Sequence, residues 1–318
     1  MARTGPNVFI VGAPRSGTTS LHSLLAQHPE AFMSPVKEPH YFAADINRRY
    51  EQHVGRTIPS LYRSLEDYLE LFAGAGEARV RGESSVYYLY SDAAADGIAA
   101  FAPEARIVIM LREPVSFLHS LHGRLRSMGD ETCADFERAL ELEEPRARGE
   151  SLPRSVRFPE LLGYSRYARF SEGLERYFQR FGRERVRVLL FDDYRRDQRA
   201  VWDELLEFLE LSPAALPGSD EQNPHHVPRW VWLTVYLRER VHWMLDPPAG
   251  SRLDLPLRAR RKLYRRLEAF NWRPAPREAL DPELKERLKR RFEPEVRRLS
   301  ELLGRDLVAL WGYERAGS

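Results

Sequence analysis

Hydrophobic residues in the first part of the chain gather in short continuous runs. Three of these runs, at 7–11, 106–111 and 186–191, are rich in valine, isoleucine and leucine. Continuous apolar runs of this length are typical of strands that are buried on both faces, as in a parallel sheet. We therefore predict three central strands, the first of which stops at Gly12.

The segments between these runs carry apolar residues at the spacing of one helix face. The positions are Leu21, Leu24 and Leu25, then Leu118, Leu121, Leu125 and Met128, and finally Tyr167, Phe170, Leu174, Tyr177 and Phe181. Strands that alternate with helices favour a doubly wound sheet, because crossover connections place helices on both of its faces. The predicted fold class is α/β, with a P-loop-type parallel β-sheet flanked by helices.

The pattern changes after Pro224, where we predict no further strand. Helical spacing continues at 229–245, 258–270 and 282–303. We predict that these helices form the helical C-terminal part of a single domain of residues 1–318. Within it, the segment 225–280 is expected to line either an acceptor cleft or an interface.

The composition is that of a folded protein, because 43% of the 318 residues are hydrophobic and 30% are charged. The 49 Lys and Arg residues nearly balance the 47 Asp and Glu residues, so the net charge of +2 gives no reason to expect nucleic-acid binding. The sequence shows neither a bilayer-spanning apolar stretch nor a signal-peptide pattern, and Cys133 is its single cysteine. We expect a cytoplasmic protein whose anion sites are local.

A candidate phosphate loop lies between Gly12 and Thr19, where the first predicted strand passes into a helix. Its glycines allow the backbone to fold around an anion that the helix N-terminus can hold. The residues predicted to bind the phosphates of a nucleotide are Arg15, Ser16, Gly17, Thr18, Thr19 and Ser20. The glycine spacing is that of nucleoside-triphosphate P-loops, but Thr18 replaces the lysine that would reach the β and γ phosphates.

A second candidate anion site follows the strand predicted at 106–111. Arg112 stands at its end, where Mg²⁺-dependent enzymes of the P-loop class need an acidic residue. A guanidinium suits a phosphate that is held by two hydrogen bonds, and Ser116 and Ser120 lie one and two helical turns further on. The two sites fit a nucleotide with phosphates at its 5′ and 3′ ends, bound without a metal.

These sites resemble those of the sulfotransferases that use PAPS, 3′-phosphoadenosine 5′-phosphosulfate. The family's 5′-phosphosulfate loop is similar to residues 14–19, and its 3′-phosphate element is similar to residues 111–115 with Ser120. Further segments match in order, at 37–42, 82–88, 163–164, 292–296 and 304–307 with Trp311. The resemblance covers most of the chain and implies a bacterial-type enzyme similar to the heparan-sulfate sulfotransferase-like branch, with PAPS as sulfuryl donor and no metal.

The resemblance also implies roles for individual residues. Glu38 lies in the segment that carries the catalytic base in the heparan-sulfate-type branch, so it is expected to take the proton of an acceptor hydroxyl or amine. Arg15 would neutralise the charge that gathers on the bridging oxygen, and His40 has either an acid–base or a structural role. Lys37 and Ser84 are predicted to contact the substrate. The alternative for Glu38 is a simple ion pair with Lys37 on a solvated loop.

Two positions depart from the pattern of the family. Arg15 stands where many members have lysine, and it can stabilise a leaving phosphate electrostatically without donating a proton usefully. Ser84 stands where the heparan-type enzymes have a second lysine near the sulfuryl group. Both departures weaken heparan as the acceptor.

Other assignments stay open at this stage. The competing functions are an ATP-dependent P-loop kinase with a degenerate motif and a silent nucleotide-binding scaffold. A carbohydrate, a lipid-linked sugar or a secondary metabolite is compatible as acceptor. The basic run 258–266 is either a solvated helix face or a contact for an anionic acceptor or membrane surface, and His225 with His226 is a weak metal candidate.

Overall fold

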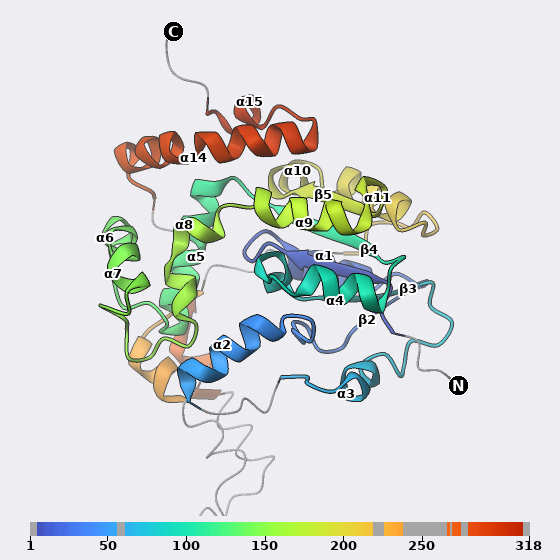
Figure 1. The fold of residues 1–318 in the computed structure, drawn as a ribbon, viewed down its shortest axis with the longest axis horizontal. Helices are drawn as coiled ribbons and strands as arrows, with labels where there is room; N and C mark the ends of the chain where they lie inside the picture. Colours follow the sequence, from blue (N-terminus) through green and yellow to red (C-terminus); the bar gives the residue numbers. More distant parts are fainter. Residues whose placement is uncertain are drawn as a thin grey trace, which may run out of the picture. The chain divides into compact units, whose positions relative to one another are not determined.

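A parallel five-stranded sheet is the core of the larger of two units of the chain (Figure 1). The strands are β1 (Val8–Gly12), β2 (Ala31–Met33), β3 (Val80–Ser84), β4 (Arg106–Leu111) and β5 (Val186–Leu190). Their order across the sheet is β2-β3-β1-β4-β5, and each neighbouring pair is parallel. The three strands predicted from apolar runs are confirmed as β1, β4 and β5, and so is the doubly wound parallel sheet.

The computed structural model describes residues 5–55, 61–218, 226–237, 266–267, 269–274 and 279–313. The larger unit consists of the chain up to Leu118, Ser165–Asp220 and Lys285 onward, and the second unit consists of His119–Tyr164 and Glu221–Leu284. The single domain therefore stays a prediction. No helix within the described ranges is long and apolar enough to cross a bilayer.

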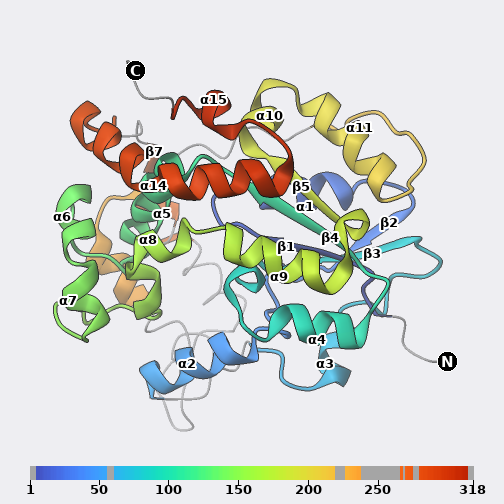
Figure 2. The ribbon, with the colours of Figure 1, turned by 45° about the horizontal axis from the view of Figure 1, so that its top comes forward.

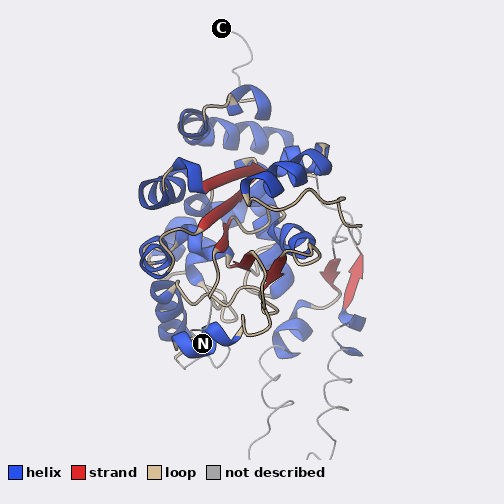
Figure 3. Ribbon diagram, turned by 90° about the vertical axis from the view of Figure 1, so that its right-hand side faces the viewer, coloured by secondary structure: helices blue, strands red, loops and turns tan. Residues whose placement is uncertain are grey.

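Helices cover both faces of the sheet, as Figures 2 and 3 show. On one face, α1 (Thr18–Leu25) and α11 (Gln198–Phe208) pack on strand residues such as Ile10 and Val108 in one buried apolar cluster. On the other face, α9 (Ser171–Phe181) contacts β4 and β5 and packs beside α4 (Ala94–Phe101). The sheet is therefore buried on both sides, which explains the continuous apolar runs of its central strands.

The sequence pattern did not reveal β2 and β3. β2 has only three residues, and β3 contains the polar residues Arg81, Glu83 and Ser84. The side chains of Glu83 and Ser84 are nevertheless fully buried. A strand with buried polar residues breaks the apolar pattern, and these residues belong to the candidate site described below.

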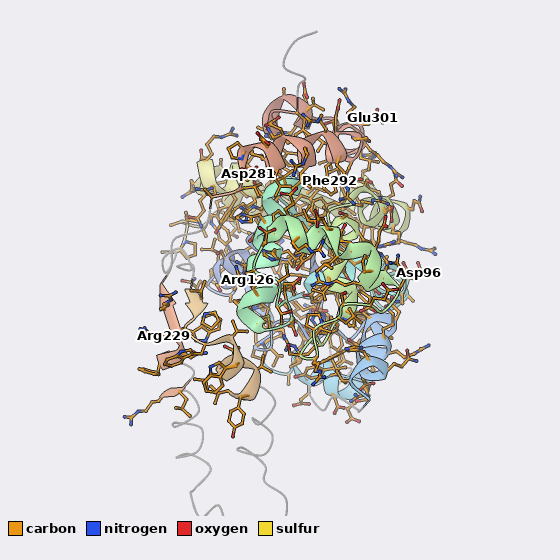
Figure 4. The ribbon with its side chains drawn as sticks, turned by 90° about the vertical axis from the view of Figure 1, so that its left-hand side faces the viewer. Asp96, Arg126, Arg229, Asp281, Phe292 and Glu301 are labelled. Carbon is orange, nitrogen blue, oxygen red and sulfur yellow. The ribbon has the colours of Figure 1, made fainter. Side chains whose placement is uncertain are left out.

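The remaining elements connect the sheet or extend from it. They are α2 (Ala44–Val54), α3 (Leu65–Glu70), η1 (Val86–Tyr90), α5 (Pro114–Met128), α6 (Phe136–Glu141), α7 (Glu143–Ala147), η2 (Pro159–Leu162), α8 (Tyr164–Tyr167), η3 (Arg183–Arg185), α10 (Phe191–Arg196), α14 (Pro282–Leu303) and α15 (Leu307–Trp311). The helix predicted at 282–303 is confirmed as α14. Its predicted apolar face is buried at Phe292, whereas Glu301 is exposed (Figure 4).

A pair of antiparallel strands in the second unit contradicts the expectation that no strand follows Pro224. These strands are β6 (His226–Pro228) and β7 (Trp272–Pro274). Each has three residues and ends in proline, so no alternation of polar and apolar residues marks it in the sequence. The helix predicted at 229–245 is confirmed over 231–237; residues 229 and 230 precede the helix, and 238–245 lie outside the described residues.

Asn271 links the two segments of this strand pair. Its Oδ1 accepts a hydrogen bond from the Trp230 amide at 3.0 Å, and its Nδ2 donates to the Trp230 carbonyl at 3.1 Å. The guanidinium of Arg229, labelled in Figure 4, lies over the Phe270 ring at 5.9 Å. Of the basic run at 258–266, only Arg266 lies within the described residues.

The close packing of α9 on η1 gives a test of the fold. A Cβ added at Gly173 would lie 2.6 Å from the backbone oxygen of Leu89, which cannot move as a flexible side chain can. We therefore expect Gly173→Ala to lower the free energy of unfolding by about 1–3 kcal/mol, although alanine favours helix. Urea unfolding would measure this, with Gly218→Ala as the control, because a Cβ at Gly218 meets nothing within 4 Å. An unchanged midpoint for Gly173→Ala would contradict the packing.

Candidate active site

The candidate phosphate loop connects β1 to α1 as the sequence predicts. Gly17 is the N-cap of α1 in the left-handed region at φ 94°, and it gives the first helical turn no side-chain cap. A helix N-terminus without a side-chain cap presents backbone amides and a positive dipole end to an anion. The Ala13 amide donates to the Met110 carbonyl of β4 at 2.7 Å, so the loop is fixed to the sheet edge.

The side chains of this loop differ in their exposure. Ser16 and Thr18 are buried, whereas Arg15, Thr19 and Ser20 are exposed. The Ser16 hydroxyl contacts the Pro14 carbonyl at 3.4 Å, inside the loop. The loop therefore offers its exposed guanidinium and the start of α1 to solvent, the arrangement that an incoming phosphate requires.

The two arginines predicted to bind phosphate lie close to each other. Nη1 of Arg112 lies 3.5 Å from the backbone oxygen of Arg15. The guanidinium of Arg112 also lies over the Phe191 ring at 5.1 Å, which restricts its orientation. The structure thus places both cationic residues at the carboxyl edge of β1 and β4, where ligands bind in open α/β sheets.

Glu113, the acid next to Arg112, has a structural role. Its two carboxylate oxygens accept the amides of Val115 at 2.9 Å and Ser116 at 2.7 Å, and the Tyr313 hydroxyl donates to it as well. The carboxylate therefore caps the first turn of α5. Ser120 lies further along α5 in the second unit, so its place at the 3′-phosphate stays a prediction.

The loop after β2 brings Lys37, Glu38 and His40 together. Lys37 Nζ lies 2.7 Å from Glu38 Oε1, and His40 Nε2 lies 3.5 Å from Glu38 Oε2. The ion pair with Lys37 considered from the sequence therefore exists, but its side chains are 22% and 36% exposed and so do not lie on a fully solvated loop. The Glu38 amide donates to the Ser84 carbonyl at 2.8 Å, which attaches this loop to the end of β3.

The electrostatic surroundings keep Glu38 ionised. Burial raises its pKa, but the hydrogen bond from His40 and the charge of Lys37 outweigh burial and lower the pKa to about 2. Because the carboxyl group is already ionised, it can accept a proton without first having to release one. While both of its oxygens have a partner, however, it is a weak base at neutral pH.

His22 joins the site although the sequence analysis did not select it. Its Nδ1 lies 2.9 Å from the Ser84 hydroxyl. Burial and the nearby charge of Lys37 lower the pKa of His22 to about 4, so the ring is neutral at pH 7. The available sequence signal was its position one helical turn after Thr18, on the same face of α1.

A buried carboxylate behind the loop was also missed. Glu83 is 0% exposed and accepts three hydroxyl donors, from Ser85 at 2.7 Å, Tyr88 at 2.8 Å and Tyr68 at 3.0 Å. Burial raises the pKa of Glu83 although these donors oppose it. Successive side chains of a strand point to opposite faces of the sheet, so the side chains of Glu83 and Ser84 point in opposite directions. The sequence alone does not show which of these two side chains faces the loop.

The metal candidate of the sequence analysis is not tested by the structure. His225 lies outside the described residues, and the described part of the chain contains no group of three His, Cys, Asp or Glu residues that could hold a metal ion.

Comparison with known proteins gives one family and several relatives. The model of the sulfotransferase family matches residues 6–214. Carbohydrate sulfotransferase 15 of Mus musculus is 26% identical over 254 residues, which cover 65% of this chain and 44% of that protein. Bifunctional heparan sulfate N-deacetylase/N-sulfotransferase 1 of Caenorhabditis briggsae is 25% identical over 65% of this chain and 23% of that protein. The chain thus spans less than half the length of these curated relatives.

A solved structure is similar over nearly its whole length. It is the sulfotransferase from Alicyclobacillus acidocaldarius, which is 27% identical, with a TM-score of 0.68 over 96% of this chain and 98% of that one. The similarity therefore extends beyond the residues that the family model matches.

The ion pair between Lys37 and Glu38 leads to a prediction about titration. In Lys37→Met, the Glu38 carboxyl loses an attraction that favours its charged form, so its pKa should rise from about 2 toward 4.5. A lowered native pKa contributes stability that is complete above the unfolded-state pKa and is lost as the pH falls through the native pKa.

The carboxyl carbon signal of Glu38 in an NMR titration between pH 3.5 and 7 measures this change. We expect no titration in the wild type and in Lys285→Met, which removes an exposed lysine. Titration of Glu38 in the wild type within this range would contradict the proposed electrostatic surroundings.

Proposed function

Because this chain belongs to the sulfotransferase family, whose model matches residues 6–214, we propose that it transfers a sulfuryl group from PAPS to a hydroxyl or amine of an acceptor. The observation that carries the proposal is a continuous chain of contacts. The Glu38 amide bonds the Ser84 carbonyl, and the Ser84 hydroxyl bonds His22 of the phosphate-loop helix. These contacts attach the loop that carries the candidate base to the helix that begins at the candidate phosphate site, which supports the proposal.

The residues present fit PAPS as the donor. The N-terminus of α1, with Gly17 as an N-cap that lacks a side chain, suits the 5′-phosphosulfate, and Arg15 lies beside it. Arg112 and Ser120 are proposed for the 3′-phosphate. PAPS, when bound, supplies the sulfuryl group and leaves as the bisphosphate.

Glu38 is proposed as the general base. It takes the proton of the acceptor hydroxyl or amine while the acceptor atom forms a bond to sulfur and the bond from sulfur to the bridging oxygen breaks. Arg15 and Lys37 stabilise the negative charge that gathers on that oxygen. When Lys37 turns toward this charge, Glu38 loses its cationic partner, its pKa rises, and it becomes a stronger base.

A glycan is the proposed acceptor class. The relatives described above are named for carbohydrate and heparan sulfate substrates. The second unit also exposes large aromatic side chains, with Trp232 65% and Phe270 61% exposed. The face of an aromatic ring is an apolar surface on which the C–H face of a sugar ring can stack. The segment 225–280, predicted to line an acceptor cleft or an interface, contains both residues.

The family assignment does not favour the kinase alternative, and Arg112 at the end of β4 supports the same conclusion. An acidic residue there would help to hold Mg²⁺, whereas the adjacent Glu113 caps α5.

Ligand-dependent stability separates the candidate functions. Adenosine 3′,5′-bisphosphate in EDTA should raise the thermal midpoint, because a ligand that binds only the folded protein stabilises it by about 2.7 kcal/mol at about 100 times its Kd. The measurement is a thermal shift with and without Mg²⁺. Stabilisation by Mg-ATP alone would favour the kinase, and binding without transfer to any glycan would favour a silent scaffold.

The role of Glu38 gives a second prediction. Glu38→Gln should lower kcat by about 10²–10⁴-fold, because an amide cannot take the acceptor proton. Binding of adenosine 3′,5′-bisphosphate, measured by calorimetry, should be nearly unchanged. Glu77→Gln, an exposed loop residue, is the matched control. If Glu38→Gln turns over labelled PAPS and a glycan acceptor as fast as this control, Glu38 is not the base.

A further inference from the structure

Three alternate amides hold the loop that carries Glu38. The Glu38 amide donates to the Ser84 carbonyl at 2.8 Å, and the His40 amide donates to the Ser85 hydroxyl at 3.1 Å. The Phe42 amide donates to the Tyr88 hydroxyl at 3.1 Å. The first of these anchors is backbone and the other two are side-chain hydroxyls, so substitution can remove the last two separately.

Both hydroxyl anchors depend on the same buried carboxylate. A hydroxyl has a single proton, and the hydroxyls of Ser85 and Tyr88 direct theirs to Glu83 at 2.7 and 2.8 Å while their oxygens accept the loop amides. Glu83 therefore fixes the direction of both hydroxyls. Hydrogen bonds to a carboxylate are stronger than neutral ones, and burial of all three side chains strengthens them further.

The loop needs such anchors because its backbone is strained. Glu38 and His40, on either side of Pro39, have φ values of 63° and 54° in the left-handed region. Residues other than glycine are held there at a cost of about 1–3 kcal/mol each, and they stay there only when the surroundings impose the conformation. Without its anchors the loop would relax, and the Glu38 carboxylate and the His40 ring would leave their present positions.

We propose that Glu83 is a positioning residue for sulfuryl transfer, which acts through Ser85 and Tyr88 to fix the backbone that carries Glu38 and His40. This inference rests on the proposed function. It assigns two different tasks to the three consecutive residues 83–85, since Ser84 faces His22 whereas Glu83 and Ser85 face the interior behind the loop.

Two tyrosines provide a matched test. Tyr88→Phe and Tyr68→Phe each remove one hydroxyl donor to the same oxygen of Glu83, and both side chains are 0% exposed. Only the Tyr88 hydroxyl also accepts a loop amide among the hydrogen bonds of the described residues. The two variants should therefore lose similar stability, whereas their catalytic effects should differ.

We expect Tyr88→Phe and Ser85→Ala to lower kcat by about 10- to 100-fold, the size of effect that a small misplacement of a catalytic group produces. The KM for PAPS should change less than about twofold, because the phosphate loop has its own anchors on β4. Tyr68→Phe should keep the wild-type kcat. Equal kcat losses in both tyrosine variants, or losses in neither, would overturn the proposal.

A double-mutant cycle tests whether the effect passes through Glu38. In the Glu38→Gln background, Ser85→Ala should cause little further loss of kcat, because the group that it positions is already absent. If the two losses multiply, Ser85 acts independently of Glu38 and the positioning role is wrong.

Amide hydrogen exchange tests the anchoring of the loop even if the protein transfers no sulfuryl group. The amides of His40 and Phe42 should exchange faster in Tyr88→Phe than in Tyr68→Phe at equal global stability. Unchanged exchange in Tyr88→Phe would overturn the inference. If the expected exchange difference is found but the wild-type protein transfers no sulfuryl group from PAPS, only the proposed function is overturned.

Discussion

The parallel pairing of β1 with β3 on one side and β4 on the other is the constraint on which the site depends. Ile10 pairs with Ser84, and Gly12 pairs with Ile109, so all three strands end at the same edge of the sheet. The candidate phosphate loop follows β1, and Arg112 follows β4. Had either neighbour been antiparallel, its functional residue would lie at the opposite edge, a strand length away.

The electrostatics at this edge of the sheet depend on how its charged side chains are paired, rather than on the net charge of the chain. A net charge of +2 cannot attract a multiply charged anion strongly, so the cations must be concentrated where the anion binds. Arg15 and Arg112 lie together, and the acid between them and α5, Glu113, has its charge distributed over two backbone amides. Glu38 has other partners, because His40 and Lys37 lie beside its carboxylate and lower its pKa to about 2.

Sequence reasoning found the parts of the molecule that local patterns specify. The apolar runs predicted β1, β4 and β5, and the glycine spacing predicted the loop that joins β1 to α1, the candidate phosphate loop. It failed where tertiary contacts decide the outcome. β3 carries buried polar residues that only their partners make acceptable, and Glu83 becomes informative only when Tyr68, fifteen residues away in sequence, is known to bond it. The strands β6 and β7 have three residues each, too few for a strand pattern, and the Asn271 side chain bonds the Trp230 backbone just beyond the paired residues.

The contact between Ser84 and His22 explains the electrostatic effect of having serine where the heparan-type enzymes have lysine. In the family pattern that this chain resembles, a lysine at this position adds a cation near the reacting group. Here a hydroxyl is bonded to an imidazole whose pKa is about 4, so the pair is neutral at pH 7. Desolvation is the larger cause of that low pKa and Lys37 the second, because two cations this close would repel each other. The neutral pair thus leaves Lys37 as the ammonium beside Glu38. A lysine at position 84 would place a second cation near Lys37, whose charge already acts on His22, so a serine there avoids that repulsion and leaves Lys37 and His40 as the partners of the proposed base Glu38.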